Sequence, residues 1–276
     1  MTPRRRRRAG LTLVELLVVM VLVGAFGLAV TRLLMSQTRM FARTASARDA
    51  RAVSRNALNI VRDEMRMIEP RGIVTATDTA LTVNVPYAMG VYCASNTATF
   101  VPVDSLTWAQ AVYAGYAYRD TTLNAAYTYV AKSGALASGS ASTCTAGPGI
   151  TPISGGPLVV LSPALPSLPG GSPVLLYQTV TYTLAPSVLV PGRTALWRRV
   201  SGGVSEEIAV PFQNTAIFRF YVSGSSTAQN APPATLSSIT GIELVLVGES
   251  ETRVAGRSGP ETSSVRLSIF FRNAVS

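Results

Sequence analysis

The sequence predicts an α+β fold in which one long N-terminal helix packs on an antiparallel β-sheet domain. The first observation is an apolar run from Leu11 to Val30, after which no proline occurs until Pro70. The second is a change beyond Pro70, where Ser, Thr, Gly, Pro and Val dominate and short runs alternate between apolar and polar residues. Helical periodicity followed by strand alternation favours a helix layer packed on a sheet around one core.

The N-terminal apolar run has the length of a membrane helix. Of its twenty residues only Thr12 and Glu15 are polar, and a helix of this length spans about 30 Å. Arg4–Arg8 precede it and predict that the N-terminus stays in the cytoplasm while the rest of the chain crosses the membrane. Three alternatives fit: a secretory signal peptide, a plain membrane anchor, or a segment in which Glu15 has a function.

The stretch GLTLVELLVVMVLVG, from Gly10 to Gly24, closely resembles the signature of type IV prepilins, in which a basic leader ends in Gly before a hydrophobic run. The resemblance implies that a prepilin peptidase cleaves between Gly10 and Leu11 and then N-methylates Leu11. Leu11 is a mild departure, because the family usually has Phe at this position. Residues 1–10 would be a discarded leader, and residues 11–30 would form the membrane and assembly half of the helix.

The same resemblance implies an assembly role for Glu15, the fifth residue of the processed chain. Its carboxylate would neutralise the amino terminus of a neighbouring subunit as that subunit enters the filament. Cleavage before Leu11 creates a positively charged amine about one helical turn away, and a paired charge costs less in lipid than an unpaired one. The alternative is that Glu15 lies near enough to the membrane surface to reach water.

The helix is expected to continue as an amphipathic half over residues 31–69, which gives one helix from about residue 11 to about residue 68. Apolar residues near helical spacing are Leu34, Phe41, Ala45, Val53, Ala57, Ile60, Val61 and Ile68. We expect this half to cover the sheet. Any bend should come from Gly24 and Gly27, since Arg32 stands where many pilins have Pro. The seven arginines from Arg32 to Arg62 favour a solvated face, with binding of acidic neighbours or DNA as the alternative.

Residues 70–276 predict a β-rich globular domain beyond the membrane. Alternating runs begin at Ala80, Thr179, Ile217, Gly241 and Ser264. In the last of these, SVRLSIFF, one face carries Val265, Leu267, Ile269 and Phe271, and the other carries Arg266, Ser268 and Arg272. This alternation is typical of an antiparallel strand with one buried side, which the amphipathic half of the helix would cover.

An insertion is expected around residues 87–157. Residues 72–192 carry only five charged side chains, and seven of the ten tyrosines lie between Tyr87 and Tyr129. Two interpretations compete. These aromatics form an exposed adhesive loop, or they pack the sheet and the extra strands of the insertion, which we favour.

Cys93 and Cys144 lie outside the apolar segment and are the only cysteines. In an exported chain such an isolated pair favours a disulfide, whereas in a cytosolic chain it favours two free buried thiols. A disulfide closing a loop of this size would stabilise the fold by about 4 kcal/mol in the chain-entropy treatment.

The composition argues against an enzyme. The chain has no His, which removes Ser-His-Asp and Cys-His arrangements and the usual zinc sites. It has no phosphate-binding G-x-x-x-x-G-K-[ST] motif. Glu206 and Glu207 are expected in a turn between strands and lack the further oxygen ligands that calcium requires. We therefore expect no catalytic residues, no metal and no cofactor.

A second resemblance covers Val180 to Val247, where VTYTL, ALWRRVSGG, EEIAVPFQNTAIFRFYV and LSSITGIELVLV follow in order. This order is similar to the C-terminal half of J-type pseudopilins and PilW-type minor pilins. It implies a minor pilin that helps initiate and build a type IV pilus, or alternatively a J-type minor pseudopilin of a type II secretion system. The implied partners are other minor pilins, the major pilin, the prepilin peptidase, the inner-membrane assembly platform and the membrane. The chain would cross the inner membrane once, with its bulk in the periplasm, and later enter a pilus or pseudopilus.

Two rival functions belong to other classes. The formal net charge is +10, and without the five leader arginines 19 basic residues against 14 acidic ones leave +5. This charge is compatible with nucleic acid as a partner, as in a DNA-capturing component of a competence pilus. The other rival is a plain single-pass anchored periplasmic domain.

Overall fold

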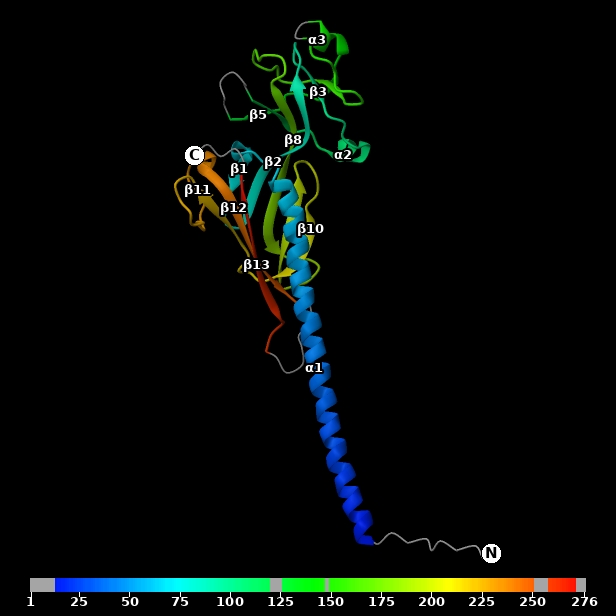
Figure 1. The fold of residues 1–276 in the computed structure, drawn as a ribbon. Coiled ribbons are helices and arrows are strands. Elements are labelled where there is room, and N and C mark those ends of the chain that lie inside the picture. Colours follow the sequence, from blue (N-terminus) through cyan, green and yellow to red (C-terminus); the bar gives the residue numbers. More distant parts are fainter. Residues whose placement is uncertain (1–12, 120–125, 147–148, 251–257, 272–276) are drawn as a thin grey trace, which may run out of the picture.

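The long helix projects far beyond an elongated head domain (Figure 1). The computed structural model describes residues 13–119, 126–146, 149–250 and 258–271. Helix α1 spans Leu13–Met65, 53 residues, which corresponds to a length of about 80 Å. It runs unbroken through Gly24 and Gly27 and ends at Met65. Glu69, the residue before Pro70, is extended, as a following proline favours.

The head consists mainly of β-strands. The elements that follow α1 are η1 (Pro70–Gly72), β1 (Ile73–Ala76), β2 (Ala80–Tyr92), β3 (Thr97–Phe100), α2 (Ser105–Gln110), β4 (Gly115–Tyr118), β5 (Thr128–Ala131), β6 (Ala137–Ser138), α3 (Ala141–Thr145), β7 (Leu158–Val160), β8 (Pro173–Pro186), β9 (Thr194–Val200), β10 (Glu206–Phe212), β11 (Ile217–Val222), η2 (Leu236–Ser238), β12 (Ile239–Glu249) and β13 (Thr262–Phe270). All five runs that the sequence predicts as strands lie in this set. The expected α+β architecture is confirmed.

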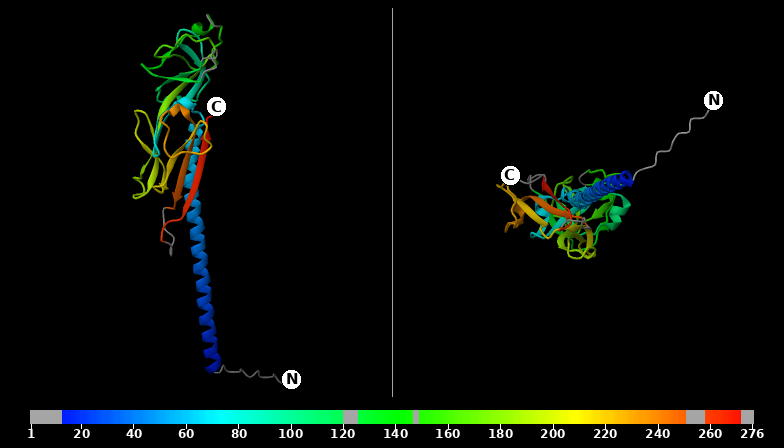
Figure 2. Two further views of the ribbon diagram at one scale, coloured as in Figure 1. Left: turned by 90° about the vertical axis from the view of Figure 1, so that its left-hand side faces the viewer. Right: turned by 90° about the horizontal axis from the view of Figure 1, so that it is seen from below.

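The described strands form one antiparallel sheet in the order β11-β12-β10-β9-β8-β2-β3-β7-β6, with β1 added to β2, β13 to β12, and β4 joining β8 to β5. The long strands β2 and β8 pair along most of their length, and their register shifts between Pro86 and Ala88. At this shift the sheet passes from a part covered by α1 to a distal lobe, which lies beyond the end of the helix (Figure 2). The two parts have separate buried cores.

The last turns of α1 pack on the sheet and close the larger core. Ala57, Val61 and Met65 are at most 2% exposed and lie in one cluster with residues of β12 and β13. The predicted alternation of β13 is confirmed, since Ile269 is buried, Val265 and Leu267 are partly buried against the core, and Arg266 and Ser268 are exposed. The inward side chains of β13 therefore meet the helix, as one buried face of an antiparallel sheet requires.

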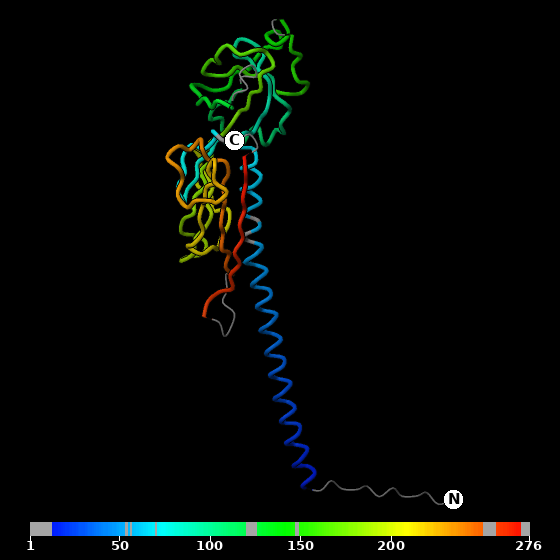
Figure 3. Tube along the Cα trace, turned by 60° about the vertical axis from the view of Figure 1, so that its left-hand side comes forward, coloured from blue at the N-terminus to red at the C-terminus, as the bar shows by residue number. Residues whose placement is uncertain are grey.

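The predicted apolar stripe of the helix is wrong in its first part. Leu34 is 56% exposed and Phe41 is 74% exposed, and cover by the head begins only at Ser46. Leu34 precedes Val61 by 27 residues, which is about seven and a half turns, so the two residues lie on opposite sides of the helix. Moreover, all residues of the segment 31–45 are exposed, whichever side of the helix they lie on, because the described part of the head does not reach this far along α1 (Figure 3).

A group of charged and polar side chains joins the helix to the sheet beside the apolar core. Arg198 on β9 donates from Nη2 to Glu64 Oε1 over 2.7 Å and from Nε to the same oxygen over 3.1 Å. Tyr182 on β8 donates its hydroxyl to Glu64 Oε2. Burial raises the pKa of Tyr182 and the Glu64 charge raises it further. The tyrosine thus stays a neutral donor at any ordinary pH.

The disulfide expected for an exported chain is present between Cys93 and Cys144. Cys93 follows directly after β2, and Cys144 lies in the short helix α3 of the distal lobe. Both are buried. The bond ties the helix–loop segment of the lobe back to the strand that runs down into the α1-covered part.

The contact between Glu64 and Arg198 predicts that removing the Glu64 charge lowers the free energy of unfolding. In Glu64→Gln the partly buried guanidinium of Arg198 loses its counterion, so the free energy of unfolding should fall by about 2 kcal/mol. Urea unfolding of the detergent-solubilised chain measures this. The matched control is Asp63→Asn on the exposed side of the same turn, which should change stability by less than about 0.5 kcal/mol. Equal effects of the two variants would contradict the structural role of Glu64.

Candidate functional site

The apolar half of α1 is exposed to solvent along its length. Leu13 is 80% exposed, Phe26 is 73% exposed and Leu28 is 67% exposed. Among the described residues, α1 is the one helix long and apolar enough to cross a membrane, and its most apolar stretch of 18 residues is not buried by any described part of the chain. So large an apolar surface needs a lipid or protein environment.

Of the residues expected to act in processing and assembly, only Glu15 lies within the described chain. Gly10 and Leu11 both lie outside the described residues. Glu15 lies in the first described turn of α1, on an exposed part of the helix. A carboxylate in this turn is favourably placed against the partial positive charge of the helix N-terminus.

The tyrosines of the distal lobe pack inside the fold. Tyr116 is fully buried and donates its hydroxyl to the carbonyl oxygen of Pro163 over 2.9 Å. Tyr87 makes an edge-on ring contact with Trp108, and Tyr129 packs on Tyr177. The packing interpretation is therefore correct for these side chains, and they do not form an exposed adhesive loop.

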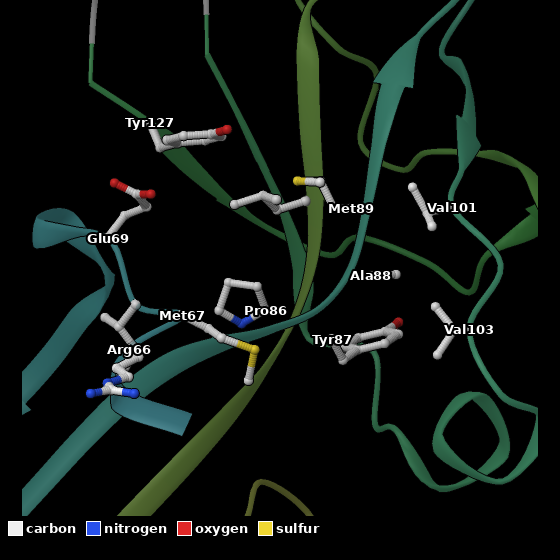
Figure 4. Close-up of a pocket in the computed structure, with 12 residues that line it drawn as sticks. Arg66, Met67, Glu69, Pro86, Tyr87, Ala88, Met89, Val101, Val103 and Tyr127 are labelled. Carbon is white, nitrogen blue, oxygen red and sulfur yellow. The ribbon is translucent and has the colours of Figure 1, made fainter. Parts of the chain in front are cut away.

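A groove of about 520 Å³ lies where the end of the helix, strand β2 and the distal lobe meet. Arg66 and Glu69 lie on one side of it, and Val101 and Val103 lie on the other (Figure 4). Its other lining residues are Met67, Ile68, Pro86, Tyr87, Ala88, Met89, Tyr127 and Leu175. The walls are mostly apolar, with one charge of each sign at the rim, so the groove is suited to apolar groups.

The acidic pair of β10 has a structural use. Glu206 and Glu207 are the first two residues of strand β10. The sequence-based prediction that they lie in a turn between strands is therefore wrong. Glu207 accepts hydrogen bonds from the Ser187 hydroxyl and from the backbone N–H of Val188, which fixes the turn after β8. Within the described ranges, no three His, Cys, Asp or Glu side chains gather as a metal site would require.

Glu64 and three arginines of the helix have roles in the structure that are not among the sequence-based predictions. Glu64 carries no local signal, because its partners come from strands more than a hundred residues later. Arg32, Arg39 and Arg43 belong to the seven helix arginines for which the sequence favours a solvated face, with binding of acidic neighbours or DNA as the alternative. Their spacing of seven and four residues puts them on one side of a helix, and this signal was available from the sequence.

Comparison with known proteins finds one match, confined to the N-terminus. Residues 5–31, about a tenth of the chain, match the family model described as the prokaryotic N-terminal methylation motif. No curated protein and no solved structure matches the chain. The motif supports a type IV pilin-like protein that is processed by a prepilin peptidase, and together with the apolar helix it suggests that the protein is anchored in a membrane.

The packed tyrosines predict a loss of stability at high pH. Burial is the main cause that raises the pKa of Tyr113 to about 12 and that of Tyr116 to about 12, and neighbouring tyrosines add to it. The pKa of tyrosine in the unfolded chain is about 10. The two tyrosines therefore contribute fully to folding stability below about pH 10, and this contribution is lost as the pH rises to about 12. The urea midpoint should fall over this interval while tyrosinate absorbance appears.

The control for this prediction is the double variant Tyr113→Phe and Tyr116→Phe, which keeps the rings and removes the ionisable groups. It should lower stability at neutral pH and flatten the fall above about pH 10. An unchanged slope in the variant would mean that other groups cause the alkaline loss.

Proposed function

We propose that the chain is a minor pilin of the PilW type, which helps to initiate and build a type IV pilus. The observation that carries the proposal is the methylation motif at residues 5–31, which overlaps the start of a helix whose apolar half is not covered by any described part of the chain. Such a helix is suited first to the membrane and then to the core of a filament. The protein acts by assembly and not by turnover.

Processing is the first step of the proposal. The peptidase cleaves between Gly10 and Leu11 and N-methylates Leu11, so residues 1–10 are lost. Residues 11–30 form the membrane and assembly half of the helix, and residues 31–69 carry the head of residues 70–276 away from the membrane. The segment around 87–157 is an insertion in that head.

Assembly then depends on Glu15. Before assembly the chain spans the inner membrane once, with its N-terminus in the cytoplasm and its bulk in the periplasm. A carboxylate in this segment is costly unless it is paired, so pairing with the new amine of a neighbouring Leu11 favours entry beside a subunit already in place. Repeated contacts of this kind that do not close into a ring produce a filament.

The partners in this proposal are other minor pilins, the major pilin and the inner-membrane assembly platform. A J-type pseudopilin of type II secretion remains the alternative, since it shares the same physics and differs in the machine. Neighbouring pilus genes or secretion genes would separate the two. Salt-sensitive binding of duplex DNA would instead favour the DNA-capturing alternative.

The processing step predicts the mature N-terminus. Mass spectrometry of the membrane-extracted chain should find N-methylated Leu11 and no leader. Gly10→Val should retain residues 1–10, because a branched side chain at the cleavage site obstructs the peptidase, whereas Ala9→Ser should be processed normally. Any other N-terminus on the wild-type chain would support the plain anchored domain and contradict the pilin proposal.

The pairing step predicts a defect in assembly alone. Glu15→Gln should be cleaved and inserted like the wild type, but its recovery in sheared filaments should fall by about tenfold or more, because the neighbouring amine is left unpaired. Quantitative immunoblotting of sheared and membrane fractions measures this. Glu15→Asp keeps the charge and should restore part of the recovery. Normal recovery of Glu15→Gln would exclude the pairing role.

A further inference from the structure

A row of arginines lies on the bare part of α1 between the apolar half and the head. Arg32, Arg39 and Arg43 line one shallow hollow together with Met35, Ser36 and Met40. Successive arginines are seven and four residues apart, so they lie within about 40° of one another around the helix. We call these three arginines the basic stripe.

The basic stripe has no counterion within the described part of the chain. None of its arginines is within 4.0 Å of a carboxylate oxygen there. After Glu15 the next acidic residue in the sequence is Asp49. Three guanidinium groups therefore lie together on an exposed helix face, and arginine forms paired hydrogen bonds with phosphate oxygens.

The stripe is at the height of a membrane surface if α1 spans the bilayer. Leu33, Leu34 and Met35 are each more than half exposed and extend the apolar segment past Arg32. The side chain of Arg32 can reach outward along such a segment to the polar layer. Arg39 lies about 6 Å beyond Met35 and Arg43 about 12 Å beyond it, which matches a headgroup layer of about 5–8 Å and the reach of an arginine.

A second copy of the chain is a poor source of the missing anions. Residues 70–276 contain 11 basic and 9 acidic residues, so the head is itself slightly basic. Glu207, Glu243 and Glu249 of this set already have partners inside the fold. A membrane surface that contains anionic lipid offers phosphate groups at the required height and in excess.

We infer that the basic stripe binds the phosphate groups of anionic lipids at the outer surface of the membrane, before the subunit is assembled. This inference rests on the proposed membrane anchoring by α1. The stripe lies on the same side of the helix as Ala50 and Ala57, which face the head, about 180° from the apolar side of Leu34 and Phe41. Lipid contacts at the stripe therefore leave the apolar side open to other subunits.

Lipid selectivity of the full-length chain tests the inference. The chain is reconstituted into phosphatidylcholine bilayer discs that contain spin-labelled phosphatidylglycerol or spin-labelled phosphatidylcholine, and the immobilised fraction of each label is measured. The wild type should prefer phosphatidylglycerol, with about fivefold per arginine in contact as the upper range. The triple variant R32Q/R39Q/R43Q should lose this preference, and high salt should reduce it in the wild type.

The matched control is R48Q/R51Q/R55Q, which removes the same charge from exposed positions farther along the helix. These residues lie about 20 Å or more beyond Met35, out of reach of the headgroups, so the preference should persist. Equal loss in both triple variants, or no preference in the wild type, would overturn the inference.

Further measurements distinguish lipid phosphate from free phosphate and from DNA, and they also test the proposed membrane anchoring. Binding of inorganic phosphate that needs the stripe, in a chain that does not select phosphatidylglycerol, would assign the stripe to free phosphate and overturn the inference. Binding of duplex DNA that needs the basic stripe, in a chain that does not select phosphatidylglycerol, would also overturn the inference. Failure of the chain to enter the discs would overturn the proposed anchoring as well, whereas normal insertion without selectivity overturns the lipid inference alone.

Discussion

The last turns of α1 lie against the inward face of the sheet, and the described parts of the fold are arranged around this contact. Ala57, Val61 and Met65 complete the larger core, which would otherwise expose the inward side chains of β12 and β13. Because one continuous helix carries both this buried face and the apolar N-terminal half, the head is held at a set distance from any membrane. A rigid connection of this kind transmits the position of the membrane segment to the head.

Polar and covalent links then make this arrangement specific. Glu64 is held by Arg198 and Tyr182 from two neighbouring strands, so the helix is fixed along its axis as well as across it. The pair is only partly buried, which keeps its desolvation cost below that of a fully enclosed ion pair. In the distal lobe, the disulfide between Cys93 and Cys144 and the packed tyrosines replace contact with the helix, which ends below this lobe.

The bare part of the helix has two unlike sides. Leu34 and Phe41 are on the side away from the head, while the basic stripe is on the side beneath it. An apolar side suits helix contacts inside a filament, and a basic side suits phosphate at a membrane surface. The two environments that a pilin-like subunit meets in turn thus correspond to two faces of one segment.

Local features can be predicted from the amino-acid sequence without a structure. They are the length of the apolar run, the methylation motif, the strand alternation of β13 and the α+β order of elements. These follow from spacing between near neighbours, which period and composition reveal. The sequence also indicated a disulfide, conditional on export. It could not determine which apolar residues of the helix meet the sheet, because Leu34 and Val61 both fit a local amphipathic pattern, and how far the head reaches along the helix depends on the folded sheet.

The partners of Glu64, the burial of the tyrosines and the extent of the bare helix follow from the tertiary structure. These depend on contacts between residues far apart in the chain, which no local period encodes. The processing residues Gly10 and Leu11 show the opposite case. Their proposed role rests on a short linear motif that a peptidase would read, so the sequence carries it without any folded neighbour.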